Sequence, residues 1–468
     1  MVRGVGLAVA LAVVVAVLIW QTGRPGTRVA LVISGGTVVT MDGQGTVIHD
    51  GAVAIDGNQI VAVGTAADIA AQYAAAERVD ARGQIVLPGL INTHGHAPMV
   101  LFRGLADDMA LMDWLNQYIF PAEKATVSPE FVRIGTRLAA LEMIESGTTT
   151  YADMYYFEEE IARATVDAGL RGVLGQTIIR FPVADAATPE EGLARTESFL
   201  KEFAGHALIT PAVAPHAPYT LTPETLQAAR ALANKYNVPL LIHLAETKDE
   251  VGMIAQQFKQ SPAMFLDGLG VWNGRSLAAH AVWVDDADIA MLAARKVGLS
   301  HNPESNMKLA SGTAPVPAWL AQGALAGLGT DGAASNNDLD MFEAMRTAAL
   351  LHKHATGDPR TLPARQALEL ATRRGAEALG MGDRIGSLEA GKLADVITVS
   401  VDSARQTPLF DPLSHLVYVT RGTDVRTTIV HGRVLMRQGK VVSLDRDDVL
   451  REARGMAEKV SAAVRSQK

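Results

Sequence analysis

Cysteine is absent from all 468 residues, which excludes disulfide bonds, thiol catalysis, thiolate metal ligands and a lipidated N-terminal cysteine. An oxidising compartment is not excluded, because a chain without free thiols is unharmed there. Long basic runs are also absent, and 42 basic against 50 acidic residues give a formal charge of −8. Nucleic acid is therefore not an expected partner. Downstream of the N-terminal segment we find neither internal repeats nor low-complexity stretches.

The N-terminal segment is the compositional anomaly of the chain. An unbroken apolar run covers residues 5–20 and follows Arg3. As a helix it would span about 24 Å, less than the ~30 Å hydrocarbon core of a bilayer. A clear small-x-small cleavage site does not follow. We predict that residues 1–24 form an export signal that stays attached and anchors a soluble catalytic domain to a membrane. A buried helix of the fold is the alternative, and cleavage and orientation stay open.

Two strand-rich segments flank the centre of the chain. Over 29–88, short β-rich runs alternate with turn signals such as Asp56-Gly57-Asn58, and Asp-Gly between such runs favours a hairpin. Strand-like sequence returns over 386–441. We expect the two segments to form one small β-sandwich. The tail, 442–468, is predicted to be a helix with an apolar packing face.

Between the flanks, over 89–385, strands alternate with helical stretches, which is typical of βα units. The eight predicted strands are Val86–Asn92, Thr148–Met154, Gly172–Ile178, Ala207–Ala214, Pro239–Leu244, Ser276–Ala281, Gly298–Ser300 and Ala324–Gly329. Eight units over about 300 residues predict an α/β fold of the (β/α)8, TIM-like barrel type. The active site of such a barrel collects at the C-terminal strand ends.

Six of the twelve histidines lie at or just beyond these strand ends. They are His94, His96, His216, His243, His280 and His301. A purely structural role does not explain six histidines at the strand ends. We therefore expect their side chains to converge at the mouth of the barrel.

Part of this set has the composition of a metal site. In His94-Gly95-His96, alternate residues of an extended chain point the same way and can bind one metal. Together with His243 and Asp331 they offer three imidazoles and a carboxylate, which suit Zn²⁺, Fe²⁺ or Mn²⁺. With a position left for water, such a metal lowers the pKa of the water from 15.7 to about 7. The set predicts a catalytic metal.

Longer motifs surround these residues. They are Pro88-Gly89-Leu90-Ile91-Asn92-Thr93-His94-Gly95-His96, His243-Leu244-Ala245-Glu246-Thr247, Ala279-His280, Ser300-His301-Asn302-Pro303 and Gly329-Thr330-Asp331-Gly332-Ala333-Ala334-Ser335-Asn336-Asn337. With them the chain resembles the amidohydrolase superfamily from about residue 29 to 441. Within it, the chain is similar to the methylthioadenosine/S-adenosylhomocysteine deaminase and chlorohydrolase branch.

The resemblance implies a role for each matching residue. The metal ligands would be His94, His96, His243 and Asp331. Glu246 would protonate the ring nitrogen beside the reacting carbon, and His280 would hold the attacking hydroxide. Asp331 would take the proton of the hydroxide and deliver it to the departing amine. Hydrolysis at an aromatic C–N centre needs these two elements, an activated water and an acid.

The metal is predicted to be a single divalent ion, with Zn²⁺ as first choice. Two-metal relatives bridge their ions with a carboxylated lysine at the end of strand four. Here that strand, within 207–216, contains no lysine. Two unbridged cations a few ångströms apart would repel strongly.

For the substrate, the resemblance implies contacts by His216, Trp114 and Glu123. The matching glutamate of nucleoside deaminases binds the ribose hydroxyls, while packing is the alternative for Trp114. Relatives that bind the amino-acid tail of S-adenosylhomocysteine use arginines beyond strand three. Here Gln176 falls near one such position and Arg180 is the nearby candidate. This departure puts S-adenosylhomocysteine in doubt and leaves the adenine end intact.

The sequence therefore predicts a hydrolase of non-peptide C–N bonds that deaminates a purine nucleoside, such as adenosine, methylthioadenosine or S-adenosylhomocysteine. Hydrolysis of another heterocycle, a triazine or an oxidised guanine, is the alternative on the same fold. An inactive barrel kept as a scaffold is the alternative of a different class. A complete set of metal ligands argues against the scaffold. The pathway stays open, as does the oligomeric state, including a homo-oligomer.

Overall fold

The computed structural model describes residues 26–465, and the predicted anchor at 1–24 lies outside them. Eight parallel strands form one sheet in the order in which they occur along the chain. They are β6 (Leu90–Asn92), β7 (Thr148–Tyr155), β8 (Arg171–Ile178), β9 (Ile209–Pro215), β10 (Leu240–Leu244), β11 (Ser276–His280), β12 (Gly298–His301) and β13 (Leu325–Leu328). The sheet closes where Thr93 N–H donates to Leu328 O at 2.8 Å and Asp331 N–H donates to His94 O at 3.0 Å. The predicted barrel is confirmed.

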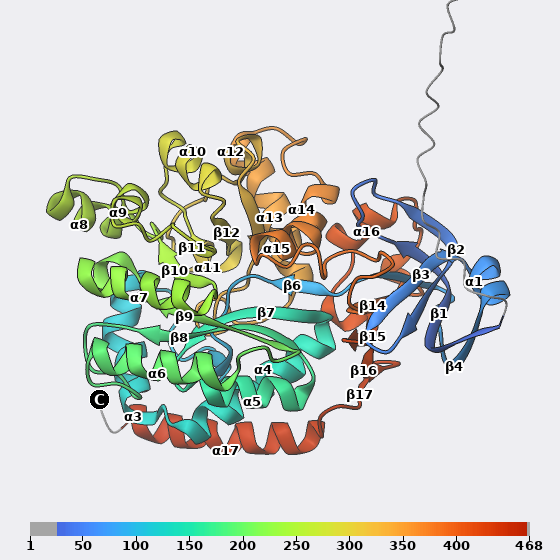
Figure 1. The fold of residues 1–468 in the computed structure, drawn as a ribbon, viewed down its shortest axis with the longest axis horizontal. Coiled ribbons are helices and arrows are strands. Elements are labelled where there is room, and N and C mark those ends of the chain that lie inside the picture. Colours follow the sequence, from blue (N-terminus) through green and yellow to red (C-terminus); the bar gives the residue numbers. More distant parts are fainter. Residues whose placement is uncertain (1–25, 466–468) are drawn as a thin grey trace, which may run out of the picture.

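Helices follow the strands and cover the outside of the barrel (Figure 1). They are α4 (Pro129–Ser146), α5 (Glu158–Ala168), α6 (Pro189–Glu202), α7 (Pro223–Tyr236), α8 (Lys248–Phe258), α9 (Pro262–Gly268), α10 (Asp286–Ala294), α11 (Pro303–Lys308), α12 (Val316–Ala321), α13 (Met341–Thr356), α14 (Ala364–Leu370) and α15 (Arg373–Ala378). Local sequence sets their ends: in α4, Ser128 caps the first turn, Pro129 follows, and Gly147 ends the helix at φ +86°.

A separate segment follows β6 and approaches the mouth of the barrel. It consists of η1 (Ala97–Phe102), α2 (Leu111–Trp114), the π-helical turn η2 (Leu115–Ile119) and α3 (Phe120–Thr126). π-Helical turns are rare and often occur at functional sites. Short 3₁₀ turns occur at η3 (Pro218–Thr220), η4 (Ala404–Gln406) and η5 (Gly422–Asp424).

The flanking segments come together in a nine-stranded sheet, seen beside the barrel in blue and red in Figure 1. Its strands are β1 (Thr27–Val39), β2 (Val47–Asp56), β3 (Gln59–Thr65), β4 (Tyr73–Asp80), β5 (Gln84–Pro88), β14 (Val396–Ser400), β15 (Val425–Val430), β16 (Arg433–Arg437) and β17 (Lys440–Val441). The long β1 pairs with β4 through its first half and with β5 through its second. The short helix α1 (Ala66–Gln72) packs on β1 to β4, and α16 (Pro412–Tyr418) packs against α13 and α14.

The first predicted barrel strand, Val86–Asn92, is wrong as a single element. Its first half belongs to β5, which pairs with β14, and only the second half is the barrel strand β6. The chain passes between the sheets at Gly89, where a Cβ would lie 2.1 Å from Thr149 Oγ1. Because both halves are buried and apolar, the sequence pattern does not show the break.

A buried ion pair joins the barrel to the flanking sheet. Arg171, at the start of β8, donates from Nε and Nη2 to the two carboxylate oxygens of Asp395, at 2.9 and 3.1 Å. Asp395 also accepts from His431 N–H at 2.7 Å. Both charges are desolvated, so removing either partner would leave the other uncompensated.

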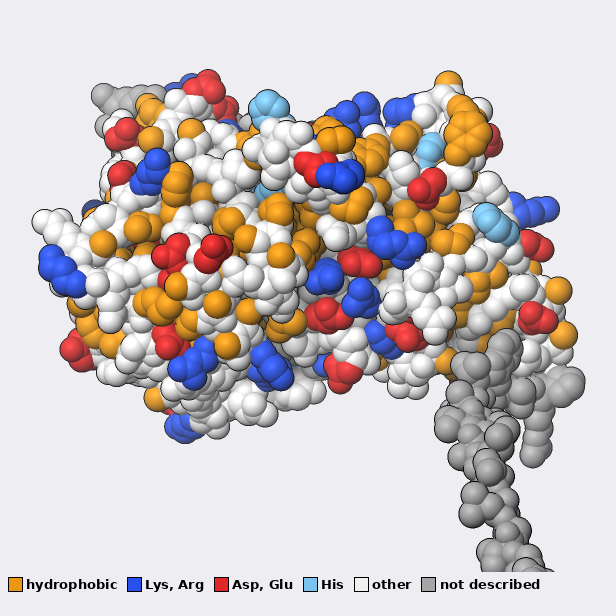
Figure 2. All heavy atoms as spheres, turned by 90° about the horizontal axis from the view of Figure 1, so that it is seen from above, with side chains coloured by type: hydrophobic (Ala, Val, Ile, Leu, Met, Phe, Trp, Pro, Cys, Tyr) orange, Lys and Arg blue, Asp and Glu red, His pale blue; other side chains and the backbone are white. Residues whose placement is uncertain are grey.

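The C-terminal helix α17 (Arg446–Arg465) lies along α3 and α4, as Figure 1 shows in red. Its predicted packing face is confirmed, because Val449, Ala453, Met456 and Val460 are buried. Among residues 26–465, no helix has the length and apolar content needed to cross a membrane. On the face drawn in Figure 2, acidic and basic side chains are interspersed with apolar ones.

Candidate active site

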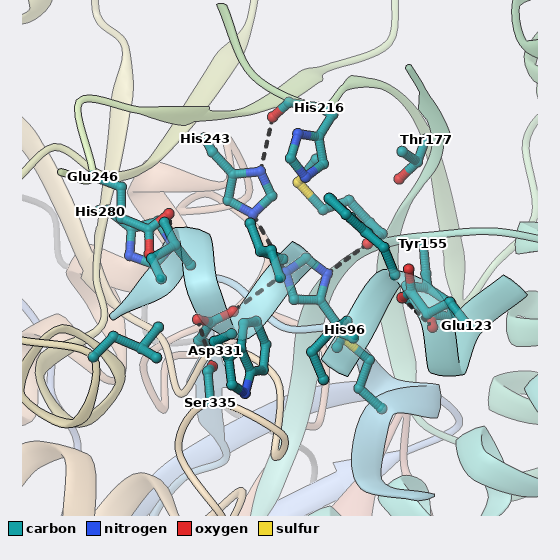
Figure 3. Close-up of a pocket in the computed structure, with 18 of the residues that line it drawn as sticks. His96, Glu123, Tyr155, Thr177, His216, His243, Glu246, His280, Asp331 and Ser335 are labelled. Carbon is teal, nitrogen blue, oxygen red and sulfur yellow. Dashed lines mark hydrogen bonds and ion pairs between the residues drawn. The ribbon is translucent and has the colours of Figure 1, made fainter. Parts of the chain in front are cut away.

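A cavity of about 640 Å³, measured out to its open mouth, lies at the C-terminal ends of the barrel strands. Its polar wall comes from separate strand ends, as Figure 3 shows. The residues involved are His96 after β6, His216 after β9, His243 in β10, His280 in β11 and Asp331 after β13. The fold thus gathers residues that are up to 235 positions apart, which is where a barrel carries its chemistry.

The four residues expected to bind metal converge. Nε2 of His94 and Nε2 of His96 each lie 3.3 Å from Asp331 Oδ1. Nε2 of His243 lies 3.3 Å from Nε2 of His96. Around one point at the barrel mouth the donors form two overlapping groups, His94 with His96 and Asp331, and His94 with His243 and His280. Within each group the donor atoms lie within 4.8 Å of one another.

The hydrogen bonds on the outer side of these rings fix which nitrogen faces that point. Nδ1 of His96 donates to Met154 O at 2.6 Å, and Nδ1 of His243 donates to His216 O at 2.8 Å. Each Nε2 therefore points toward the centre. Nε2 of His94 is buried and, among the described residues, has no hydrogen-bond partner. Three imidazole nitrogens and a buried carboxylate fit a divalent metal ion.

The electrostatics favour a cation at the same point. Burial lowers the pKa of His94 to about 4 and the pKa of His243 well below its usual value, so both are neutral and able to ligate at pH 7. Burial also lowers the pKa of His96, but the contact with Asp331 outweighs it and raises this pKa to about 9. A positive charge between His96 and Asp331 is therefore stabilised.

Two serines hold Asp331 in place, and sequence reasoning gave them no role. Ser305 and Ser335 donate to Oδ2 of Asp331 at 2.7 and 2.8 Å, which leaves Oδ1 facing the histidines. Asp331 has a φ of +63°, a left-handed conformation that aspartate adopts more readily than most residues. Ser335 belongs to the same Gly329–Asn337 motif as Asp331, whereas Ser305 comes from α11 and meets Asp331 only in the fold.

Glu246 and His280 face each other across one end of the cavity, with Glu246 Oε2 3.9 Å from His280 Nε2. Nδ1 of His280 lies 2.9 Å from Asn306 Oδ1 and 3.3 Å from Asn302 Nδ2. In the tautomer that donates to Asn306, His280 Nε2 is an acceptor toward the cavity. Burial raises the pKa of Glu246, which favours its protonated form. A carboxylic acid and a proton acceptor thus stand side by side.

Glu250 fixes the turn that carries Glu246. Its two carboxylate oxygens accept from the N–H groups of Ala245 and Glu246 at 2.8 and 2.9 Å. Ala245 has a φ of +47°, which costs energy for a residue with a Cβ. Glu250 is buried, and burial raises its pKa to about 8. The side chain therefore stabilises the strained turn that directs Glu246 into the cavity.

Glu123 and Tyr155 occupy the other end of the cavity, on the far side of His96 in Figure 3. Tyr155 O–H donates to Glu123 Oε1 at 2.6 Å. Burial raises the pKa of Glu123 to about 7, while the Tyr155 hydrogen bond and the positive charge of His96 lower it. Tyr155 follows the last predicted residue of its strand and had no expected role.

The remaining predicted residues are placed differently. Trp114 and His216 line the cavity. Arg180 is exposed and is not part of this lining; it borders a neighbouring hollow that shares Tyr219. Gln176 is buried and donates to Asp185 Oδ2 at 2.8 Å.

His301 corrects the expectation that six histidines converge. Its Nε2 lies 3.2 Å from Nε2 of His352 on α13, and its ring packs against Trp319. It is not part of the cavity lining. Neighbouring residues of a strand face opposite sides, and here Ser300 points inward to Thr93 Oγ1. His301 therefore packs among the outer helices.

Comparisons with known proteins agree with this geometry. The amidohydrolase family model matches residues 85–435. The chain belongs to the amidohydrolase family. Residues 51–76 also match an imidazolonepropionase-like composite domain of bacteria.

Individual relatives are similar over almost their whole length. The chain is 46% identical to a 5-methylthioadenosine/S-adenosylhomocysteine deaminase of Syntrophobacter fumaroxidans, over 92% of this chain and 98% of the relative. A zinc-bound adenosine deaminase from Xanthomonas campestris superposes with a TM-score of 0.92 at 39% identity, over 94% of this chain and 100% of the other. An atrazine chlorohydrolase from Arthrobacter aurescens complexed with zinc superposes with a TM-score of 0.85 at 26% identity, over 91% and 100%.

Proposed function

We propose that this amidohydrolase is a metal-dependent aminohydrolase that deaminates adenosine-type purine nucleosides. The observation that carries the proposal is the content of one cavity. It holds a metal-donor cluster, an acid with a raised pKa beside it, and a buried carboxylate suited to a ribose diol at the opposite end. The names of the adenosine and methylthioadenosine deaminases to which the chain is similar support the same substrate class.

The metal ligands in this proposal are His94, His96, His243 and Asp331. Zn²⁺ is the expected ion, because three imidazoles and a carboxylate suit it and the similar adenosine deaminase binds zinc. A divalent metal bound there supplies a water activated for attack at neutral pH. We expect one ion per chain, since β9 (Ile209–Pro215) contains no lysine that could bridge a second.

The chain's own residues then move the protons. Glu246 donates to the ring nitrogen next to the amino-bearing carbon, which makes that carbon electrophilic. Asp331 accepts one proton of the attacking water and passes it to the departing amino group, while His280 accepts a hydrogen bond and orients the water. The new C–O bond replaces the C–N bond, ammonia leaves, and the second proton of the water restores the acid form of Glu246.

At the sugar end, Glu123 accepts the two ribose hydroxyl hydrogen bonds, held in position by Tyr155. A carboxylate has enough acceptor sites for a diol and for Tyr155 together. A triazine has no such pair of hydroxyls, so Glu123 favours a nucleoside over the heterocycles that the chlorohydrolase relative suggests. Trp114 and His216 complete the substrate contacts in this proposal.

Ammonia release by the purified, zinc-loaded full chain tests the function. Adenosine, methylthioadenosine, a guanine derivative and a triazine are supplied in parallel. The proposal expects ammonia from the two adenosine-type nucleosides at rates well above those of the other two. Turnover of the triazine or the guanine derivative alone would replace it with the alternative hydrolase.

For the N-terminal segment, we propose that residues 1–24 direct the chain to or across a membrane. The support is the apolar run at 5–20 together with the Gly/Arg/Pro linker that follows it. Removing residues 1–24 is expected to yield an active protein that no longer fractionates with membranes. A truncated chain that misfolds would instead assign the segment to the fold.

A further inference from the structure

The wall of the cavity next to Glu123 is apolar. The segment from α2 to α3 supplies Leu111, Trp114, Leu115, Ile119 and Phe120 to the lining. Glu123 comes from the same segment, one turn beyond Ile119. If Glu123 binds the sugar, a substituent of that sugar that extends along this segment therefore contacts apolar and aromatic side chains.

Among the described residues that line the cavity, the basic side chains are histidines, and His96 is paired with Asp331. Within residues 26–465, the lining of the cavity includes no lysine or arginine, while Glu123, Glu246 and Asp331 all belong to it. Basic side chains outside the lining are engaged with other residues or border neighbouring hollows, as the exposed Lys124 does beside Phe120. Lys308 donates to Asp107 and to Asn337 Oδ1, and the exposed Arg180 borders the neighbouring hollow beyond Tyr219.

These two features select against an anionic group. A carboxylate or phosphate placed against this wall would lose its hydration without gaining a cationic partner, which is strongly unfavourable. It would also lie near the Glu123 carboxylate in a region of low dielectric. An uncharged methyl or thioether group would instead bury apolar surface.

We propose that this site selects nucleosides whose 5′ end carries a small uncharged group and rejects those with a 5′ carboxylate or phosphate. The inference rests on the proposed function and narrows its substrate class. 5′-Deoxyadenosine and methylthioadenosine are accepted. Adenosine 5′-monophosphate is rejected as an anion, and S-adenosylhomocysteine is rejected because its tail would bring both an ammonium and a carboxylate against apolar surface. Leu115 is the position through which a charge could be introduced, since it is half-buried and lines the cavity.

The first experiment compares kcat/KM of the zinc-loaded full chain for these four nucleosides. We expect kcat/KM to be about 10²-fold or more higher for the two uncharged substrates. A buried polar group left without a hydrogen-bond partner lowers kcat/KM on this scale. Dissociation constants measured with the slow variant Glu246→Gln are expected to separate the substrates in the same order. S-adenosylhomocysteine turnover within about threefold of methylthioadenosine, lost in Arg180→Ala, would overturn the inference and leave the deaminase function standing. Absence of turnover with all four would contradict the deaminase function itself.

A gain-of-function variant tests whether the missing cation is the cause of the substrate preference. Leu115→Arg provides a cation at the apolar wall, and the long side chain can keep its charged end near the opening. It is expected to raise the kcat/KM ratio of S-adenosylhomocysteine to methylthioadenosine about tenfold. The matched variant Leu115→Gln adds polarity without charge and is expected to leave that ratio unchanged. An equal rise in both variants would show that polarity or space, and not the missing cation, sets the specificity.

Discussion

Tyr155 donates its phenolic hydroxyl to Glu123 across 2.6 Å, although the two residues lie 32 positions apart and on different elements. The bond leaves the second carboxylate oxygen of Glu123 open to the cavity and fixes the first. It thereby turns a glutamate on a short helix into an oriented acceptor for hydroxyl groups.

Replacing Glu123 by alanine is expected to lower kcat/KM for nucleosides and to leave kcat/KM for the free base nearly unchanged. Two hydrogen bonds from hydroxyls to a charged acceptor would be lost, each worth about 1.5–3 kcal/mol, so kcat/KM should fall by at least about 10²-fold. The free base adenine makes no such bonds, and its slow deamination should be nearly unchanged. Equal losses for nucleoside and base would show that Glu123 supports the cavity and does not bind ribose.

The binding of nucleosides should depend on pH through Glu123. Because burial raises its pKa to about 7, the carboxylate form that accepts both hydroxyls is dominant above pH 7 and is lost below it. Apparent nucleoside affinity, measured as 1/KM, should therefore fall as pH decreases from 8 to 6.

Tyr155→Phe provides the check on that assignment. The Tyr155 hydrogen bond lowers the pKa of Glu123, so its removal should move the pH midpoint of 1/KM upward. In Glu123→Gln the transition near pH 7 should disappear. A transition that persists in Glu123→Gln would belong to another group.

Glu250 is expected to affect the chemical step without touching substrate. In Glu250→Gln one of the two N–H groups of the turn faces an amide NH₂, so Glu246 should lose its orientation. We expect kcat to fall by about tenfold or more, with KM and bound metal unchanged, because misplacing a catalytic group slows chemistry. Asp249→Asn, at the exposed neighbouring position, is the matched control. A rise in KM with kcat intact would show that Glu250 acts on binding instead.

The metal content of the purified chain should be one ion, and a chelator should remove activity and metal together. Asp331→Ala should lose both, because this residue is expected to be a ligand and a proton carrier. Alanine is strained at the φ of +63° that Asp331 adopts, and Ser305 and Ser335 would lose their buried acceptor, so Tm should also fall. Two ions per active chain, measured by elemental analysis, would contradict the single-metal site.

The sequence predicted the barrel and the converging metal donors because both follow from local patterns. Strand-end residues of a parallel barrel share one mouth, so His94, His96, His243 and Asp331 meet once the strands are recognised. The sequence could not pair Tyr155 with Glu123 or Ser305 with Asp331, since those contacts exist only after distant elements pack.

Two errors have the same physical origin. In a four-residue strand such as β12, the inward and outward phases cannot be distinguished from polarity alone, so His301 was placed inside. At Gly89 the apolar pattern continues although the chain changes sheets. The periodicity of apolar residues indicates which residues are buried. It does not indicate which sheet or helix layer buries them.

The most direct test measures ammonia release and bound metal on the same samples of wild type and Glu246→Gln, with methylthioadenosine as substrate. The account predicts one ammonia per nucleoside consumed by the wild type. It predicts a kcat lower by about 10²–10⁴-fold in Glu246→Gln, the usual worth of a positioned acid, with metal content unchanged. A metal-loaded wild type that releases no ammonia, or a Glu246→Gln variant that works at the wild-type rate, would contradict it.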